Sequence, residues 1–152
     1  MRLDWSAFLT VIEESKRVVL TSHVRPDCDA LGSELGMAGI LEAVGKDVRI
    51  VNAQETPANL QWIDPQHKLE SLAKGVTPAD LDDRDLLIVL DTSAWAQLGA
   101  MGEVLKRQRE RVVVVDHHVS EDDLSDRWFK DPTAEATARI VYEIGLRLRV
   151  PL

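Results

Sequence analysis

The chain has 152 residues, of which 45% are hydrophobic and 29% charged, and its formal net charge is −8. This composition is ordinary for one globular domain with a real core. The acidic balance and the lack of a basic stripe disfavour long nucleic acids as partners. The single cysteine, Cys28, excludes an intrachain disulfide. With no signal-peptide core and only strand-length apolar runs, we expect a cytoplasmic protein without a membrane partner.

Apolar strand-like runs alternate with longer amphipathic segments along the chain, beginning with a predicted helix at 4–15. The remaining expected elements are a strand at 17–22, a helix at 29–44 stopped by Gly45, a strand at 47–51, a short helix within 56–70, a strand at 85–90, a helix at 94–110 interrupted near 99–102, a strand at 111–115 and a helix at 132–147. This alternation predicts an α/β fold, a three-layer, Rossmann-like domain with a parallel sheet, filling residues 1–152.

Polar residues follow three of the four predicted strands at the point where each strand ends. The first strand leads into His23, the third into Asp91, and the fourth into Asp116-His117-His118. In open α/β sheets, ligands bind outside the carboxyl ends of the strands. We therefore expect these side chains to meet on one rim.

The first of these clusters joins the first strand to the helix after it. It contains His23, Asp27 and Asp29 within seven residues. Carboxylate oxygens with an imidazole nitrogen suit Mn²⁺, Mg²⁺, Fe²⁺ or Zn²⁺. An Asx turn at Asp27 with Asp29 capping the helix explains the same residues equally well, and this cluster alone leaves both interpretations open.

The other two clusters decide between these interpretations when they are taken together with the first. Asp91 alone would be an ordinary helix cap, and we expect Asp116 to orient His117 by accepting its second ring N–H. Jointly, the three clusters supply oxygen and nitrogen ligands for two adjacent cations, with a carboxylate available to bridge them. The sequence therefore predicts a two-metal site.

These motifs resemble those of the DHH phosphoesterase family, whose third motif is Asp-His-His. His23-x-x-Pro-Asp-x-Asp-Ala-Leu-Gly-Ser33 matches the first family motif, Asp91-Thr-Ser the second, and Asp116-His-His118 the third. The segment Trp128-Phe-x-Asp-Pro-x-Ala-x-Ala-Thr137 is similar to the branch that contains nano-RNases and pAp phosphatases. The resemblance covers essentially the whole chain.

The resemblance implies that His23 and Asp27 hold one cation, that Asp29 and His117 hold the other, and that Asp91 bridges both. Mn²⁺ is the first expectation for both cations, with Mg²⁺ or another divalent ion as the alternative.

The resemblance also implies a residue that faces the substrate phosphate, namely His118. Arg25 is a further candidate for a phosphate contact, although a solvent-facing loop arginine explains it equally well. We also expect the backbone N–H groups of Gly32 and Ser33, near a helix start, to hold a phosphate oxygen.

The implied activity is hydrolysis of phosphate esters of small nucleotides such as pAp, or of very short oligoribonucleotides, by water activated between two metals. The family's fourth motif and C-terminal substrate-binding domain would follow Leu152, so we expect the chain to be a piece of a longer protein or a natural remnant. The alternatives are a same-fold hydrolase of pyrophosphate or cyclic dinucleotides and a non-catalytic metal- or nucleotide-binding module. A homodimer also stays open.

Overall fold

The structure, a computed structural model, describes residues 3–120 and 122–152. Its main helices are α1 (Trp5–Glu14), α2 (Cys28–Ala43), α3 (Met101–Arg107) and α4 (Thr137–Arg147), and its short 3-10 helices are η1 (Ala58–Ile63), η2 (Pro78–Leu81), η3 (Trp95–Gln97) and η4 (Arg109–Arg111). The strands are β1 (Arg17–Thr21), β2 (Asp47–Asn52), β3 (Leu69–Ser71), β4 (Leu86–Leu90), β5 (Val112–Asp116) and β6 (Trp128–Lys130). In this described part of the chain, no helix is long and apolar enough to cross a membrane.

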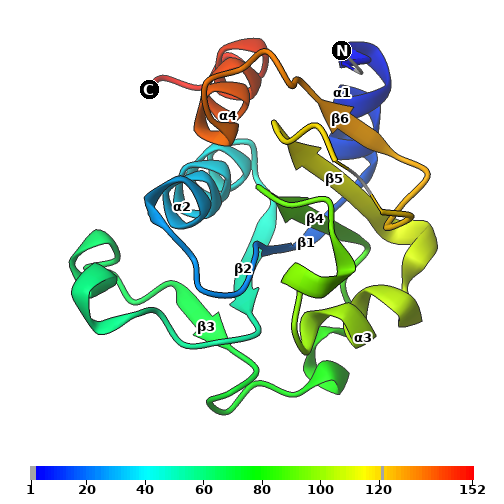
Figure 1. Ribbon diagram of the computed structural model, residues 1–152. Helices are drawn as coiled ribbons and strands as arrows, with labels where there is room; N and C mark the ends of the chain where they lie inside the picture. The colour runs from blue at the N-terminus through cyan, green and yellow to red at the C-terminus, as the bar shows by residue number, and fades with distance from the viewer. Residues whose placement is uncertain (1–2, 121) are drawn as a thin grey trace.

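The strands form one parallel sheet in the order β3-β2-β1-β4-β5-β6. Helices cover both faces, with α1, α2 and α4 on one side and α3 on the other (Figure 1). The predicted three-layer α/β fold is therefore confirmed. The chain winds outward from β1 to β3 and then crosses back to β4, so the sheet changes winding direction between β1 and β4, where such folds bind ligands.

The central strands are apolar on both faces because each face is covered by helices. In β4 all five residues are buried, and alternate side chains enter two different core clusters. Leu86, Ile88 and Leu90 pack with α1, α2 and α4, whereas Leu87 and Val89 face α3. This double burial explains why these strands could be recognised as continuous apolar runs.

Two strands were not predicted, and both are three-residue edge strands with mixed composition, β3 and β6. The interrupted helix predicted at 94–110 is found as η3, α3 and η4. The last helix starts at Thr137, five residues later than predicted, because residues 131–136 form a turn. In that turn, Asp131 accepts hydrogen bonds from the backbone N–H and hydroxyl of Thr133.

Candidate metal centre

The ends of β1, β4 and β5 bring the three predicted clusters to one rim of the sheet. These strands are neighbours, and Thr21 pairs with Val89 while Leu90 pairs with Val115, so the residues that follow them emerge side by side. They open into a cleft of about 580 Å³, whose lining residues are His23, Asp27, Asp29, Asp91, Thr92, Ser93, Ala94, Gln97, His117, His118 and Ser120. The expectation that the parallel topology gathers these side chains is met.

Asp91 lies at the centre of the cleft and is only 2% exposed. Its Oδ2 is 3.3 Å from His23 Nε2, and its Oδ1 is 3.5 Å from His117 Nε2. The backbone at Asp91 is left-handed, with a φ of 64°, and its N–H donates to the carbonyl of Val115. The two oxygens of one carboxylate thus face histidines from two different strand ends.

The two carboxylates of the first cluster cap different helices. Asp27 accepts from the N–H of Ala30 and caps α2, and its Oδ1 also lies 3.8 Å from His23 Nε2. Asp29 instead caps α4, since its two oxygens accept from the N–H groups of Thr137 and Ala138. Its Oδ2 remains 3.7 Å from His117 Nε2. A capping role therefore coexists with a place in the cleft for both residues, but the helix that Asp29 caps is α4 and not α2, as the sequence had suggested.

Backbone contacts direct the Nε2 atoms of two histidines toward the cleft. The Nδ1 of His23 is 2.8 Å from the carbonyl oxygen of Val24, and that of His117 is 3.3 Å from the carbonyl oxygen of Ala134. The hydrogen bond to Asp91 is the main cause that raises the pKa of His23 to about 9, against the opposing effect of burial.

The position of Asp116 differs from the expectation. Its Oδ1 lies 2.7 Å from Nδ1 of His118, not of His117, and also accepts the N–H of His118. On its other side Asp116 bonds to the hydroxyl of Ser93 and lies 3.6 Å from the ammonium of Lys130, which is itself only 2% exposed. The strand end turns His117 away from Asp116, so Asp116 orients the histidine expected to face the substrate.

The burial of Lys130 was not anticipated, because lysine is normally exposed and the strand that contains it, β6, was not predicted. Its ammonium also donates to Ser93 Oγ and to the carbonyl of Ser120. It provides a buried positive charge for the carboxylate that holds His118.

The residues expected to contact phosphate, besides His118, are Gly32, Ser33 and Arg25, and none of these three lines the cleft. Gly32 and Ser33 lie in the second turn of α2, where backbone N–H groups bond to the carbonyls four residues earlier. Their N–H groups are therefore not available to a phosphate, and this expectation is corrected. Arg25 lies exposed in the loop before α2, with a φ of 51°, and does not line the cleft.

The donor atoms fit divalent cations in two overlapping groups. One ligand atom each from His23, Asp27 and Asp91 lies within 4.8 Å of the others, and the same is true of Asp91, His117 and His118. Both groups combine imidazole nitrogen with carboxylate oxygen, a donor set suited to Mn²⁺ or Zn²⁺. Asp91 belongs to both groups. Asp29, expected to hold the second cation, belongs to neither group, although its Oδ2 lies 3.7 Å from His117 Nε2, and His118 takes its place in the second group.

A buried carboxyl group lies beneath this rim and was not anticipated. Glu34 on α2 is fully buried, and burial is the main cause that raises its pKa to about 7. Its Oε2 accepts from Asn52 Nδ2, while Asn52 Oδ1 accepts from the N–H of Ser22, the residue before His23. The sequence pattern placed Glu34 on an ordinary helix and gave no sign of this contact.

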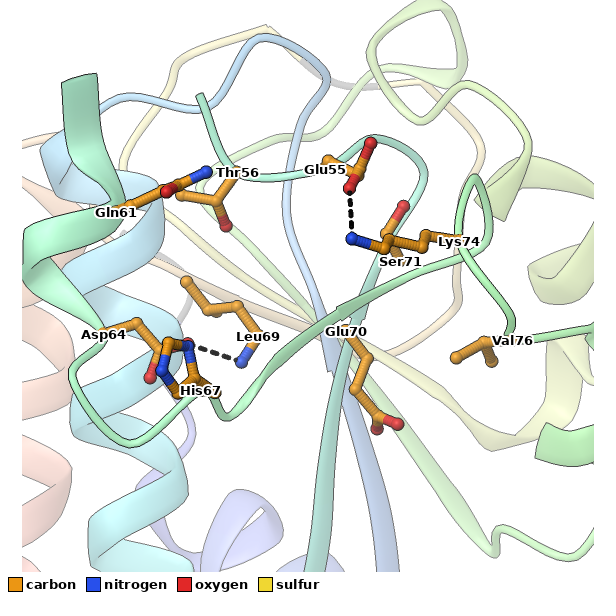
Figure 2. A pocket seen from close by; sticks show the side chains of 10 residues that line it. All are labelled: Glu55, Thr56, Gln61, Asp64, His67, Leu69, Glu70, Ser71, Lys74 and Val76. Atoms are coloured by element: carbon orange, nitrogen blue, oxygen red, sulfur yellow. Dashed lines mark hydrogen bonds and ion pairs between the residues drawn. The ribbon is translucent and has the colours of Figure 1, made fainter. Parts of the chain in front are cut away.

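A second cavity, of about 470 Å³, lies beside β3 and contains none of the predicted site residues (Figure 2). Two of its charged side chains, Asp64 and Lys74, are engaged with the backbone or with a neighbouring side chain. Asp64 accepts the N–H groups of Lys68 and Leu69, and Lys74 pairs with Glu55 at 3.5 Å. Neither group of potential metal-ligating side chains found among the described residues lines this cavity, so the metal centre is the candidate functional site.

Comparison with known proteins agrees with the motifs. The chain is 30% identical over 148 residues to the cyclic-di-AMP phosphodiesterase GdpP of Bacillus subtilis, covering 91% of this chain and 22% of that protein. It is 26% identical over 133 residues to the bifunctional oligoribonuclease and PAP phosphatase NrnA of the same organism, covering 85% of this chain and 38% of that protein.

The fold is similar to a crystal structure of an exopolyphosphatase-related protein from Bacteroides fragilis. The TM-score is 0.85 at 25% identity, and the match covers 94% of this chain and 43% of that one. The chain therefore spans less than half the length of each of these relatives. The model of the DHH family, N-terminal domain, matches residues 17–149, so the chain belongs to the DHH family.

Proposed function

We propose that this chain is the metal-binding part of a phosphoesterase that hydrolyses phosphate esters of small nucleotides, such as pAp, or of very short oligoribonucleotides. One observation carries the proposal: the two oxygens of buried Asp91 face His23 and His117 separately. The NrnA relatives, whose names describe oligoribonuclease and PAP phosphatase activity, support this substrate class.

In this proposal His23 and Asp27 hold one divalent cation, Asp29 and His117 hold the other, and Asp91 is shared. Two such cations, with Mn²⁺ as the first choice, supply activated water and neutralise charge on the phosphoryl group. The Nδ1 contacts of His23 and His117 fix the ring orientations, and Asp29 retains lone pairs beside its capping bonds.

The residue proposed to contact the substrate phosphate is His118. Its side chain is half exposed to the cleft, while Asp116 fixes its Nδ1. When the ring is protonated, its Nε2–H can donate to a phosphoryl oxygen or to the leaving group while its Nδ1–H donates to Asp116. Arg25 lies only two positions after His23, but it does not line the cleft. We therefore assign it no catalytic role in this proposal.

The test is Mn²⁺ content and Mn²⁺-dependent phosphate release from pAp by the full-length protein and its Asp91→Asn variant. Asparagine keeps the shape of the side chain and tolerates the left-handed backbone at this position. We expect the variant to lose most bound metal and activity, whereas Asp126→Asn, at an exposed position outside the cleft, should change neither. Metal content and turnover unchanged in Asp91→Asn would refute the two-metal proposal.

A cyclic dinucleotide is the second candidate substrate, because the 30% identical relative is a cyclic-di-AMP phosphodiesterase. Assays of the same protein with pAp, a linear diadenylate and cyclic di-AMP separate the candidates. Turnover of pAp without turnover of cyclic di-AMP supports the first candidate. Ring opening of cyclic di-AMP with a kcat/KM higher than that for pAp supports the second. Metal binding without turnover of any of them would favour a non-catalytic module.

A further inference from the structure

We propose that Thr137 is a positioning residue that holds the shared carboxylate of Asp91 in its bridging orientation. The inference rests on the proposed function and adds a residue to it. Thr137 is the first residue of α4, and its side chain is fully buried against the rim. It reaches the metal centre from an element that supplies no proposed metal ligand.

Thr137 makes two separate contacts with proposed ligands. Its hydroxyl donates to Asp91 Oδ1 at 2.9 Å, and its backbone N–H donates to Asp29 Oδ2 at 3.0 Å. The first N–H groups of a helix have no partner within the helix, so the backbone contact satisfies α4 as well as Asp29. The hydroxyl contact has no such structural necessity, because a hydroxyl can be replaced by a methyl group of the same shape.

The hydroxyl bond fixes the rotation of the Asp91 carboxylate. A carboxylate can turn about its terminal torsion with little resistance, because that torsion has broad energy wells. The bond to Thr137 holds Oδ1 on the side of His117, which leaves Oδ2 facing His23. Without it, both oxygens could turn toward a single cation, and the second cation would lose its bridging ligand.

Loss of a hydrogen-bond partner behind a metal ligand typically lowers metal affinity or activity about 10- to 100-fold. We therefore expect Thr137→Val to weaken Mn²⁺ binding by about tenfold or more. Turnover at limiting Mn²⁺ should fall in parallel, while the KM for pAp at saturating Mn²⁺ stays close to that of the unmodified protein. A residue important only for packing would not separate metal affinity from substrate KM in this way.

The experiment measures Mn²⁺ binding by calorimetry and by electron paramagnetic resonance in the full-length protein, together with kcat and KM for pAp. Thr137→Ser should retain most of the affinity and Thr137→Ala should lose it, since these two variants differ only by the hydroxyl. That pair carries the test if Thr137→Val does not fold. The matched control is Thr133→Val, which removes a hydroxyl bonded to Asp131 outside the cleft and should leave Mn²⁺ binding unchanged.

The outcomes separate this inference from the proposed function. Equal Mn²⁺ affinity in Thr137→Ser and Thr137→Ala, with the unmodified protein binding two ions, overturns the role of Thr137 alone. If the unmodified protein binds no Mn²⁺, the proposed function fails and this inference fails with it. A loss of affinity confined to Thr137→Ala and Thr137→Val supports both.

Discussion

The buried carboxyl group of Glu34 should make the stability of the protein fall as pH rises, and Glu34→Gln should remove this contribution while leaving that of His23. In the folded protein Glu34 is fully buried, Oε1 has no hydrogen-bond partner among the described residues, and Oε2 accepts from Asn52. Burial raises its pKa from an ordinary 4.5 to about 7. Glutamine has nearly the same shape and can still accept from Asn52, but it never ionises.

The sign follows from proton binding. Between the ordinary pKa and the raised one, the folded state binds more protons at Glu34 than the unfolded state does, so stability falls as pH rises through this interval. The stabilising contribution is complete below about pH 4.5 and is lost above about pH 7. At 1.36 kcal/mol for each tenfold change in the ionisation constant, the loss at pH 8 is about 3 kcal/mol.

The assay is urea denaturation of the metal-free protein from pH 5 to pH 8, comparing Glu34→Gln with the unmodified chain at each pH. The two should have similar stability at pH 5, and the variant should gain up to about 3 kcal/mol by pH 8. The matched control is Glu42→Gln, at an exposed position on the same helix, whose ion pair with Lys68 is worth about 1 kcal/mol or less. A constant difference between Glu34→Gln and the unmodified protein across this range would refute the reasoning.

Three further variants test the surroundings of the site. Lys130→Met should destabilise the protein by about 3–5 kcal/mol in thermal denaturation because it leaves buried Asp116 without its cation, whereas Lys106→Met at the surface should change stability by less than about 0.5 kcal/mol. His118→Gln should retain Mn²⁺ stoichiometry and lower kcat about 10²–10³-fold, and a loss of bound metal would show that His118 is a ligand. Gly99→Ala should cost about 1–3 kcal/mol, since φ is 53° and a Cβ would lie 2.9 Å from Val24 Cγ1; a variant as stable as the parent would contradict this.

Much of the site could be predicted because its residues follow strands that a local pattern reveals. The apolar runs of β4 and β5 identify central strands of a parallel sheet, and this topology places whatever follows them on one rim. His23, Asp91 and His117 were found in this way without knowledge of any contact. Placing these residues on one rim requires only that the strands be parallel neighbours in one sheet, and it does not require the pairing register between them.

The contacts between these residues could not be predicted, because they depend on segments far apart in the chain. Asp29 caps α4, more than one hundred positions away, and this long-range cap sets where the helix begins. A sequence pattern relates only neighbouring residues, so it started that helix at Pro132, and the only capping role that it offered for Asp29 was at the start of its own helix. The edge strands β3 and β6 were missed because each has only three residues, which is too short to show the apolar–polar alternation that identifies a strand.

The carboxylates at this rim are compensated by positive charge that the chain itself supplies. Asp27 and Asp29 lie at the N-termini of α2 and α4, where the helix dipoles favour negative charge. Protonated His23, with a pKa of about 9, faces Asp91, and Lys130 faces Asp116. Each of these carboxylates therefore has a positive partner within the chain. Cations bound at this rim would replace or add to these partners instead of creating the fold, so removal of metal should abolish activity while leaving the sheet and its helices intact.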